Sequence, residues 1–212
     1  MGPGEDAGVS DPAAVPELTM RFSIILLVAL LCSSVIAQKQ PAPAKDDHAS
    51  DWKEFSSAEG LFTVSLPEIP KADISTVDTP VGSLKSHFFV VETDKFLYYV
   101  AYVDLPAGPE TPEENKEALD SSRDRALANH RLISENDVTL DGIVGRELLV
   151  DRKGLIMNGR FFYAKQRLYH VILTARPHVV FRDGKASPHA KDRTDLFEKT
   201  SAKFFDSFKL TK

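Results

Sequence analysis

Hydrophobic and polar residues alternate along most of the chain from residue 61 onward. A two-residue period is the pattern of strands with one buried face. It predicts strands over the segments 61–67, 72–78, 83–92, 96–105, 131–140, 143–151, 155–164 and 167–175. The segment 72–78 alternates weakly and is expected at a sheet edge. Both faces of 96–105 carry apolar residues, so we expect both to be partly covered.

Short turns separate several of these strands. They are Thr93–Lys95, Asp141-Gly142, Lys153-Gly154 and Lys165-Gln166. Two- and three-residue connections are typical of antiparallel hairpins. We therefore expect the last four strands to form an antiparallel meander.

Two other segments repeat apolar residues every three or four positions, as helices do. The first begins with Thr111 as cap, Pro112 and then Glu114, and is expected to run to Asn129. The second is expected from about Thr194 to Phe205. Their core-facing residues should be Ala118, Leu119, Ser122, Ala126, Leu127, Leu196, Phe197, Thr200, Phe204 and Phe208.

The order of strands, helix, strands and helix predicts the fold class α+β. We expect a single large antiparallel sheet covered by helices, within a single domain over residues 51–212.

The first fifty residues follow a different pattern. Residues 20–37 combine Arg21, an apolar stretch and the small residues Val35 and Ala37, which predicts a signal peptide cleaved before Gln38. The apolar stretch is shorter than the roughly 20 residues of a membrane-spanning helix, which favours cleavage and no stable membrane span afterwards. The alternative is an uncleaved 20–37 segment that anchors the protein. Residues 38–50 are predicted to be a linker.

Residues 1–19 carry four acidic residues and no basic one, the opposite of what precedes the apolar part of a signal peptide. We interpret them as a start-site extension, with translation beginning at Met20. Cleavage before Gln38 would also remove Cys32, the one cysteine in the chain. We therefore expect an exported, thiol-free domain in the periplasm or outside the cell.

Composition narrows the function classes. The chain has a net charge of −5, and removing the first 37 residues leaves a net charge of about −2. That balance disfavours a nucleic-acid binder that works through bulk positive charge. The sequence contains no glycine-rich phosphate loop, no G-x-S-x-G nucleophile motif and no glycosylation acceptor. We expect no cofactor.

The best candidates for metal ligands lie in the segment 177–192. They are His178, Asp183, His189 and Asp192, whose imidazole and carboxylate groups suit a transition metal. Their spacing matches no known ligand pattern, so a solvated loop is the favoured interpretation.

Other polar and aromatic residues admit both structural and functional explanations. His87 and His170 lie in predicted strands, where a core or edge position is favoured over a catalytic base. Arg123, Asp124 and Arg125 suit either a site for an acidic ligand or a partner, or a solvated helix face with local ion pairs. Packing is favoured over a ligand groove for the aromatic residues Tyr98, Tyr99, Tyr102, Phe161, Phe162, Tyr163 and Tyr169.

Several short motifs resemble exported bacterial domains of the PsbP-like kind. They lie in Phe55–Pro67, Tyr102–Pro106, Gly145–Glu147, Arg167–Tyr169 and Phe204–Phe208. The resemblance implies an α–β–α sandwich that associates with larger complexes, usually without catalysis. It supplies no functional residues and does not support a photosynthetic role.

Together these observations predict an exported, non-enzymatic binding or assembly module, with an envelope protein as partner. It would act through a sheet edge, an exposed helix face or the 177–192 loop. The alternative is a small exported hydrolase or metal-dependent enzyme that uses that loop. The sequence leaves the ligand, the partner and the oligomeric state open.

Overall fold

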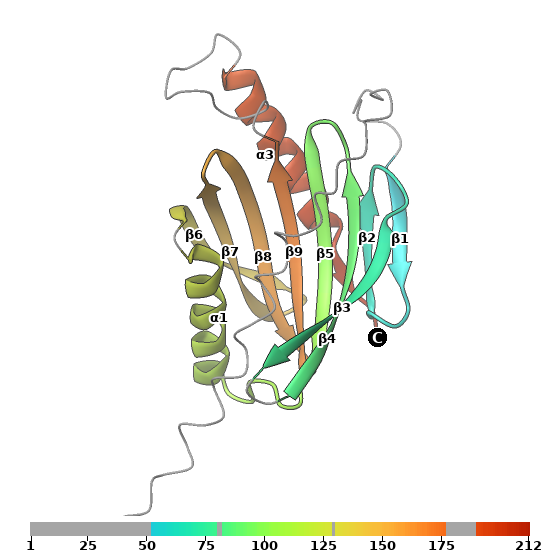
Figure 1. The fold of residues 1–212 in the computed structure, drawn as a ribbon, viewed down its shortest axis with the longest axis vertical. Helices are drawn as coiled ribbons and strands as arrows, with labels where there is room; N and C mark the ends of the chain where they lie inside the picture. The colour runs from blue at the N-terminus through green and yellow to red at the C-terminus, as the bar shows by residue number, and fades with distance from the viewer. Residues whose placement is uncertain (1–51, 80–81, 129, 177–189) are drawn as a thin grey trace, which may run out of the picture.

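The alternating segments pair into antiparallel sheets in the computed structural model, which describes residues 52–79, 82–128, 130–176 and 190–212. A seven-stranded sheet has the order β3-β4-β5-β9-β8-β7-β6 (Figure 1). Its strands are β3 (Lys71–Thr79), β4 (Gly82–Glu92), β5 (Phe96–Asp104), β6 (Arg131–Leu140), β7 (Ile143–Arg152), β8 (Leu155–Ala164) and β9 (Arg167–Ala175).

Tight turns fix the register of β6 to β9, as the sequence predicts. Asp141-Gly142, Lys153-Gly154 and Lys165-Gln166 all have positive φ at both residues, the geometry of two-residue hairpins. Each turn therefore aligns the residues that are equidistant from it, such as Asp137 with Arg146. The weakly alternating β3 lies at an edge of this sheet, as expected.

The prediction of a single sheet is wrong, because the strand at 61–67 belongs elsewhere. A three-stranded sheet has the order β1-β2-β10, with β1 (Lys53–Ser57), β2 (Phe62–Leu66) and β10 (Lys209–Leu210). The sequence pattern predicts neither β1 nor β10. β1 carries one large apolar residue, Phe55, and β10 is two residues long, so neither has the alternation that marks a strand.

The helices contact opposite faces of the seven-stranded sheet. Helix α1 (Pro112–Leu127) buries Ala118, Leu119 and Ser122 as predicted, and its main sheet contacts are with β7 and β8. Helix α3 (Ala190–Ser207) begins and ends outside the predicted limits, and its main contacts are with β2 and β9. We call the two faces the α1 face and the α3 face.

The α3 face carries the larger apolar core. On β5, the side chains of Phe96, Tyr98, Val100 and Tyr102 point to it and are each at most 2% exposed. They pack with aromatic residues of the small sheet and the C-terminal segment, where Phe208 is also buried. Burying large aromatic side chains supplies most of the stability of such a core.

Polar contacts fasten the turn between β1 and β2 to the seven-stranded sheet. The guanidinium of Arg167 donates to the carbonyl oxygen of Glu59 (2.7 Å), and the Tyr169 hydroxyl donates to that of Gly60 (3.0 Å). Arg167 also lies over the ring of Tyr102, 4.3 Å from its centroid. Burial, and then the Glu59 carboxylate, raise the pKa of Tyr102 to about 12, so its hydroxyl stays protonated.

Candidate functional site

The four candidate metal ligands fall outside what the structure describes. His178, Asp183 and His189 are not among the described residues, and the side chain of Asp192 is not described either. Within residues 52–79, 82–128, 130–176 and 190–212, no group of three or more His, Cys, Asp or Glu side chains is placed to hold a metal ion. The metal-site hypothesis therefore stays a prediction.

Both candidate histidines lie in the seven-stranded sheet. His170 is buried on the α1 face beside the Phe161 ring, and burial lowers its pKa to about 4, so it is neutral at pH 7. His87 lies on the α3 face, where its ring stacks on Tyr102 at 4.6 Å. Its Nδ1 atom is 4.0 Å from the Glu59 carboxylate. The structure thus places both as packed side chains of the sheet.

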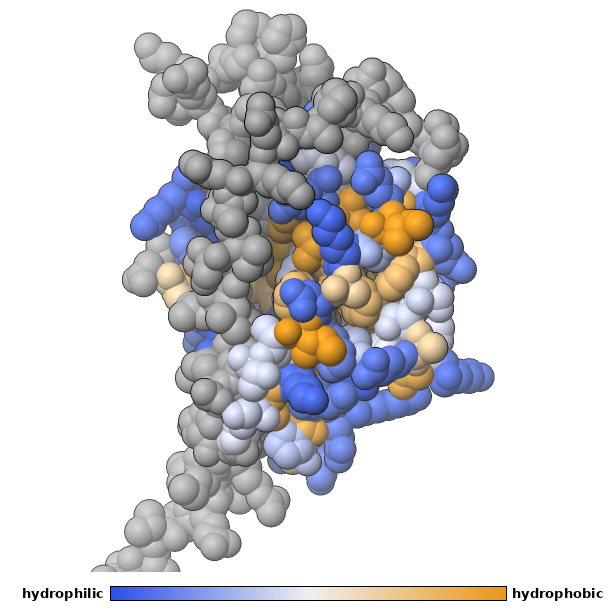
Figure 2. Space-filling model, turned by 45° about the vertical axis from the view of Figure 1, so that its right-hand side comes forward, coloured by the Kyte–Doolittle hydropathy of each residue, from blue (hydrophilic) through white to orange (hydrophobic). Residues whose placement is uncertain are grey.

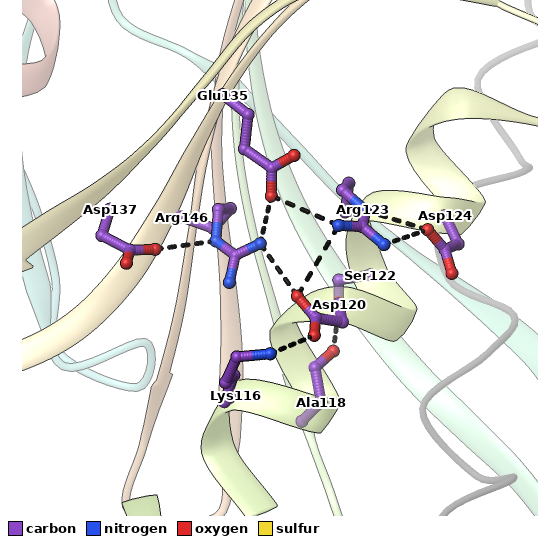
Figure 3. Close-up of polar contacts among 9 residues, drawn as sticks. All are labelled: Lys116, Ala118, Asp120, Ser122, Arg123, Asp124, Glu135, Asp137 and Arg146. Atoms are coloured by element: carbon purple, nitrogen blue, oxygen red, sulfur yellow. Dashed lines mark hydrogen bonds and ion pairs between the residues drawn. The ribbon is translucent and has the colours of Figure 1, made fainter. Parts of the chain in front are cut away.

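A network of ion pairs joins α1 to β6 and β7. At its centre is Arg146 of β7, whose side chain is 9% exposed (Figure 3). Its Nη1 atom donates to Asp120 of α1 (2.9 Å) and to Glu135 of β6. Its Nε atom lies 2.9 Å from Asp137 of β6, without the angle of a hydrogen bond. Three carboxylates thus surround one buried guanidinium.

Arg123 of α1 extends this network. Its Nη1 atom lies 3.8 Å from Asp120 and 3.6 Å from Glu135, and its Nη2 atom donates to Asp124 at 2.7 Å (Figure 3). Lys116 completes it with a bond of 2.9 Å to Asp120. Every cation in the network has a carboxylate partner, so its main effect is to hold α1 in place on the sheet.

The network predicts a specific loss of stability in acid. The pKa of Asp120 is lowered, first by the hydrogen bond from Lys116 and then by Arg146, against the opposing effect of burial. A carboxylate with a lowered folded-state pKa stabilises the fold above its unfolded pKa of about 4, and this contribution is lost as the pH falls through the folded value. Asp120→Asn should therefore be less stable than wild type at pH 7, and the difference should shrink toward pH 3.

Urea unfolding at pH 7 and pH 3 checks this expectation. Glu68→Gln is the matched control, because Glu68 is exposed in the loop between β2 and β3. If the difference in free energy of unfolding between Asp120→Asn and wild type stayed constant from pH 7 to pH 3, the stabilising role of the ionised Asp120 would be contradicted.

The opposite side of α1 carries a cation without such partners. Arg125 lies half-buried near Tyr163, and its Nε atom is buried with no hydrogen-bond partner. Burial lowers its pKa, and among the described residues no carboxylate forms an ion pair with it. Arginine stays charged at pH 7 even with a lowered pKa. An uncompensated cation in such a position costs stability.

Tyr163 cannot neutralise Arg125. The Ser122 hydroxyl donates to the Ala118 carbonyl oxygen, so the Tyr163 hydroxyl donates to Ser122 over 3.0 Å. Burial raises the pKa of Tyr163 above its usual value, which keeps the phenol neutral. The positive charge of Arg125 therefore stays unbalanced beside a buried, uncharged hydroxyl pair.

The same face of the sheet carries an apolar area over β4, β5 and β9. We call it the β4–β5–β9 patch, defined by the half-buried residues Phe88, Val90, Leu97, Tyr99 and Ile172. The main contacts of α1 are with β7 and β8, and no other described helix or strand makes comparable contacts with this face of β4 and β5. On the α3 face of the same strands, the core residues of β5 are fully buried.

Apolar residues are more exposed near β3. Ile69 is 80% exposed and Ile74 is 55% exposed. Figure 2 turns the side with β1 to β4 toward the viewer and shows apolar side chains among hydrophilic ones on that surface. Ile74 lies on the edge strand β3 and Ile69 in the loop before it, whereas the patch lies on the α1 face of β4, β5 and β9.

Comparisons with known proteins give a weak likeness. No family model matches the sequence, and no curated protein matches it. Among solved structures, it is similar to cyanobacterial PsbP (CyanoP) from Synechocystis sp. PCC 6803, with 13% identity and a TM-score of 0.49, over 81% of this chain and 99% of that one.

A second similar structure is protein PA94 of Pseudomonas aeruginosa, which is of unknown function. Its identity is 12% and its TM-score 0.34, over 73% of this chain and 95% of that one. The first structure is a PsbP, the family that the sequence motifs resemble. Both TM-scores are below 0.5, so neither likeness establishes a family or an activity.

In the described residues, no helix has the length and apolar character needed to span a membrane.

From the sequence, Arg123, Asp124 and Arg125 form a single candidate site with undivided roles. The structure divides them: Arg123 and Asp124 belong to the ion network, whereas Arg125 faces Tyr163. Helical spacing predicts this division. Arg125 lies three residues after the buried Ser122, and Arg123 lies three residues after Asp120, so the two arginines fall on different sides of the helix. The patch could not be predicted from the sequence, because its residues come from strands that are distant in the sequence.

Proposed function

We propose that the protein is an exported, non-enzymatic binding module that receives a segment of an envelope partner protein on the β4–β5–β9 patch. The segment would cover Phe88 and Val90 with apolar side chains. The single observation that carries the proposal is the half-buried apolar area that shares the α1 face with an uncompensated cation. Partly apolar surfaces bordered by charge are typical of protein-binding sites.

The position of α1 supports this proposal. The Arg146 network fixes α1 on β6 and β7, on the same face of the sheet as the patch, so this face is organised before a partner arrives. Preorganised surfaces lose less conformational entropy on binding than mobile ones. The rigid helix would therefore serve as a wall against which the partner segment lies.

A pair of valine variants tests the proposal. Val90→Lys places a charge in the patch, and Val144→Lys places one at a 48% exposed position near the start of α1. Immobilised full-length chain would be exposed to an envelope extract, and retained proteins would be quantified by mass spectrometry. We expect Val90→Lys to retain about tenfold less of a specific partner or worse, and Val144→Lys to match wild type.

The identity of the bound segment completes the test. Limited proteolysis of the retained complex should leave a protected partner segment that is apolar. Equal retention by both variants would contradict the proposal, provided that thermal unfolding shows Val90→Lys to be folded. Protection of residues 1–51 of this chain, or of a second copy, would also contradict it.

A further inference from the structure

We infer that His130, Arg152 and Lys153 form a binding site for a phosphate group where β7 ends and the turn to β8 begins. We call these three residues the 130–152–153 cluster. Arg152 is the last residue of β7, Lys153 opens the turn to β8, and His130 directly precedes β6. The β4–β5–β9 patch lies on other strands, so the inference does not rest on the proposed function.

Arg152 differs from the other arginines of the large sheet. Among the described residues, it is the one arginine of the seven-stranded sheet without an ion pair. The others all pair with carboxylates: Arg131, Arg146, Arg160 and Arg167. Arg152 donates from Nη1 to the sulfur of Met157 over 3.9 Å, and a thioether is a weak acceptor. Its guanidinium therefore has donors left for a ligand.

The register of β6 and β7 brings His130 next to Arg152. Arg131 pairs with Asp151 in the ladder. One position further along the same register, His130 lies opposite Arg152. Lys153 follows directly and is exposed. Three side chains that can carry positive charge therefore meet at this end of the sheet.

The imidazole of His130 offers a further polar atom. Its Nδ1 atom is buried and has no hydrogen-bond partner in the described part of the chain. The pKa of His130 is lowered, first by burial and then by the charges of Arg152 and Lys153. These two effects require both cations to lie near the ring. His130 is therefore neutral at pH 7 and would take up a proton when an anion binds beside it.

The carboxylate of Asp151 does not neutralise this cluster. Its Oδ2 atom accepts from Arg131 at 2.9 Å, and its Oδ1 atom accepts from the Gly154 backbone N–H at 2.8 Å. Successive side chains of a strand point to opposite faces, so Asp151 and Arg152 point away from each other. Arg152 and Lys153 thus bring two positive charges that form no ion pair with a described carboxylate.

A phosphate group suits this combination of donors. A phosphate monoester carries a charge of about −1.5 to −2 at pH 7, which matches the two unpaired cations. The guanidinium can bind two of its oxygens with a planar fork, while the ammonium acts as a point charge. The protonated imidazole would donate to a third oxygen. A carboxylate has one charge and two oxygens, so it would leave one of the cations unpaired.

NMR titration with inorganic phosphate tests this inference. In proton–carbon spectra of the full-length chain, the imidazole signal of His130 would be assigned with His130→Gln. Phosphate would then replace chloride at constant ionic strength. We expect phosphate to shift this signal saturably and to raise the pKa of His130, because a bound anion stabilises the imidazolium. The signal of His87, on the α3 face, should not respond.

Two lysines provide a matched pair of variants. Lys153 and Lys165 are both exposed, both open a two-residue turn with positive φ, and lie at opposite ends of β8. Lys153→Gln and Arg152→Gln should each weaken phosphate binding about tenfold or more, whereas Lys165→Gln should match wild type. Equal weakening by the two lysine variants would show an effect of net charge alone and overturn the site.

Vesicles separate the two sources of a phosphate group. Full-length chain would be sedimented with phosphatidylcholine vesicles that contain or lack phosphatidic acid. If the ligand is a lipid headgroup, phosphatidic acid should increase sedimentation of wild type and Lys165→Gln but not of Arg152→Gln. If it is a free phosphate ester, the NMR response should occur without this increase. Absence of both the NMR response and the increase in sedimentation would overturn the inference.

Discussion

Replacing Phe62 with alanine is expected to lower the free energy of unfolding by about 3–5 kcal/mol, as for other fully buried phenylalanines. Phe62 is 0% exposed and contacts the rings of Phe55, Phe89 and Phe208. Through these contacts β2 of the small sheet packs on β4 of the large sheet and on the segment after α3. Because domains are stable by about 5–15 kcal/mol, the loss would be a large share of the total.

Phe88→Ala is the matched control for Phe62→Ala. Phe88 is half-buried and lies on the α1 face of β4, opposite to Phe89, which contacts Phe62. It contributes to the proposed binding surface. Its replacement should cost clearly less stability in urea unfolding, while it should weaken partner retention. If the two variants lost the same free energy of unfolding, Phe62 would not have the joining role assigned to it.

Arg146→Met should lower the free energy of unfolding by about 3 kcal/mol. Removing one partner of a buried ion network leaves charges without compensation, and such losses reach about 3–5 kcal/mol. We expect the lower end of this range, because the side chains of Asp120 and Glu135 are 29% and 23% exposed to solvent. The remaining cations, Lys116 and Arg123, also compensate part of the charge.

A double variant separates the electrostatic effect from packing. Combining Arg146→Met with Glu135→Gln removes one of the carboxylates left without a cation, so part of the lost stability should return. A loss below about 0.5 kcal/mol for Arg146→Met in urea unfolding would show that the network does not hold α1 on the sheet.

Local sequence patterns predicted the hairpins of the large sheet well. Each two-residue turn determines which residues face each other, so Asp141-Gly142 places Asp137 opposite Arg146. That pair could have been found from the turn alone. The same logic gives the row of Phe161 and His170 across Lys165-Gln166.

Contacts between distant segments were beyond this kind of prediction. Pairing of β5 with β9 joins residues about 70 positions apart, and no local pattern specifies it. The ion network needs α1 to lie beside β6 and β7, and the uncompensated charge of Arg125 appears only when the helix is docked. The small sheet could not be predicted either. β1 and β10 become strands by pairing with β2, and their own sequences carry no strand pattern.

The most direct test of the binding surface is photo-crosslinking in the cell envelope. A benzoylphenylalanine in place of Phe88 would be compared with one in place of Phe55, which packs in the core of the α3 face. We expect the probe at position 88 to capture an apolar segment of another envelope protein. Capture of residues from this chain alone, or of a partner only from position 55, would contradict it.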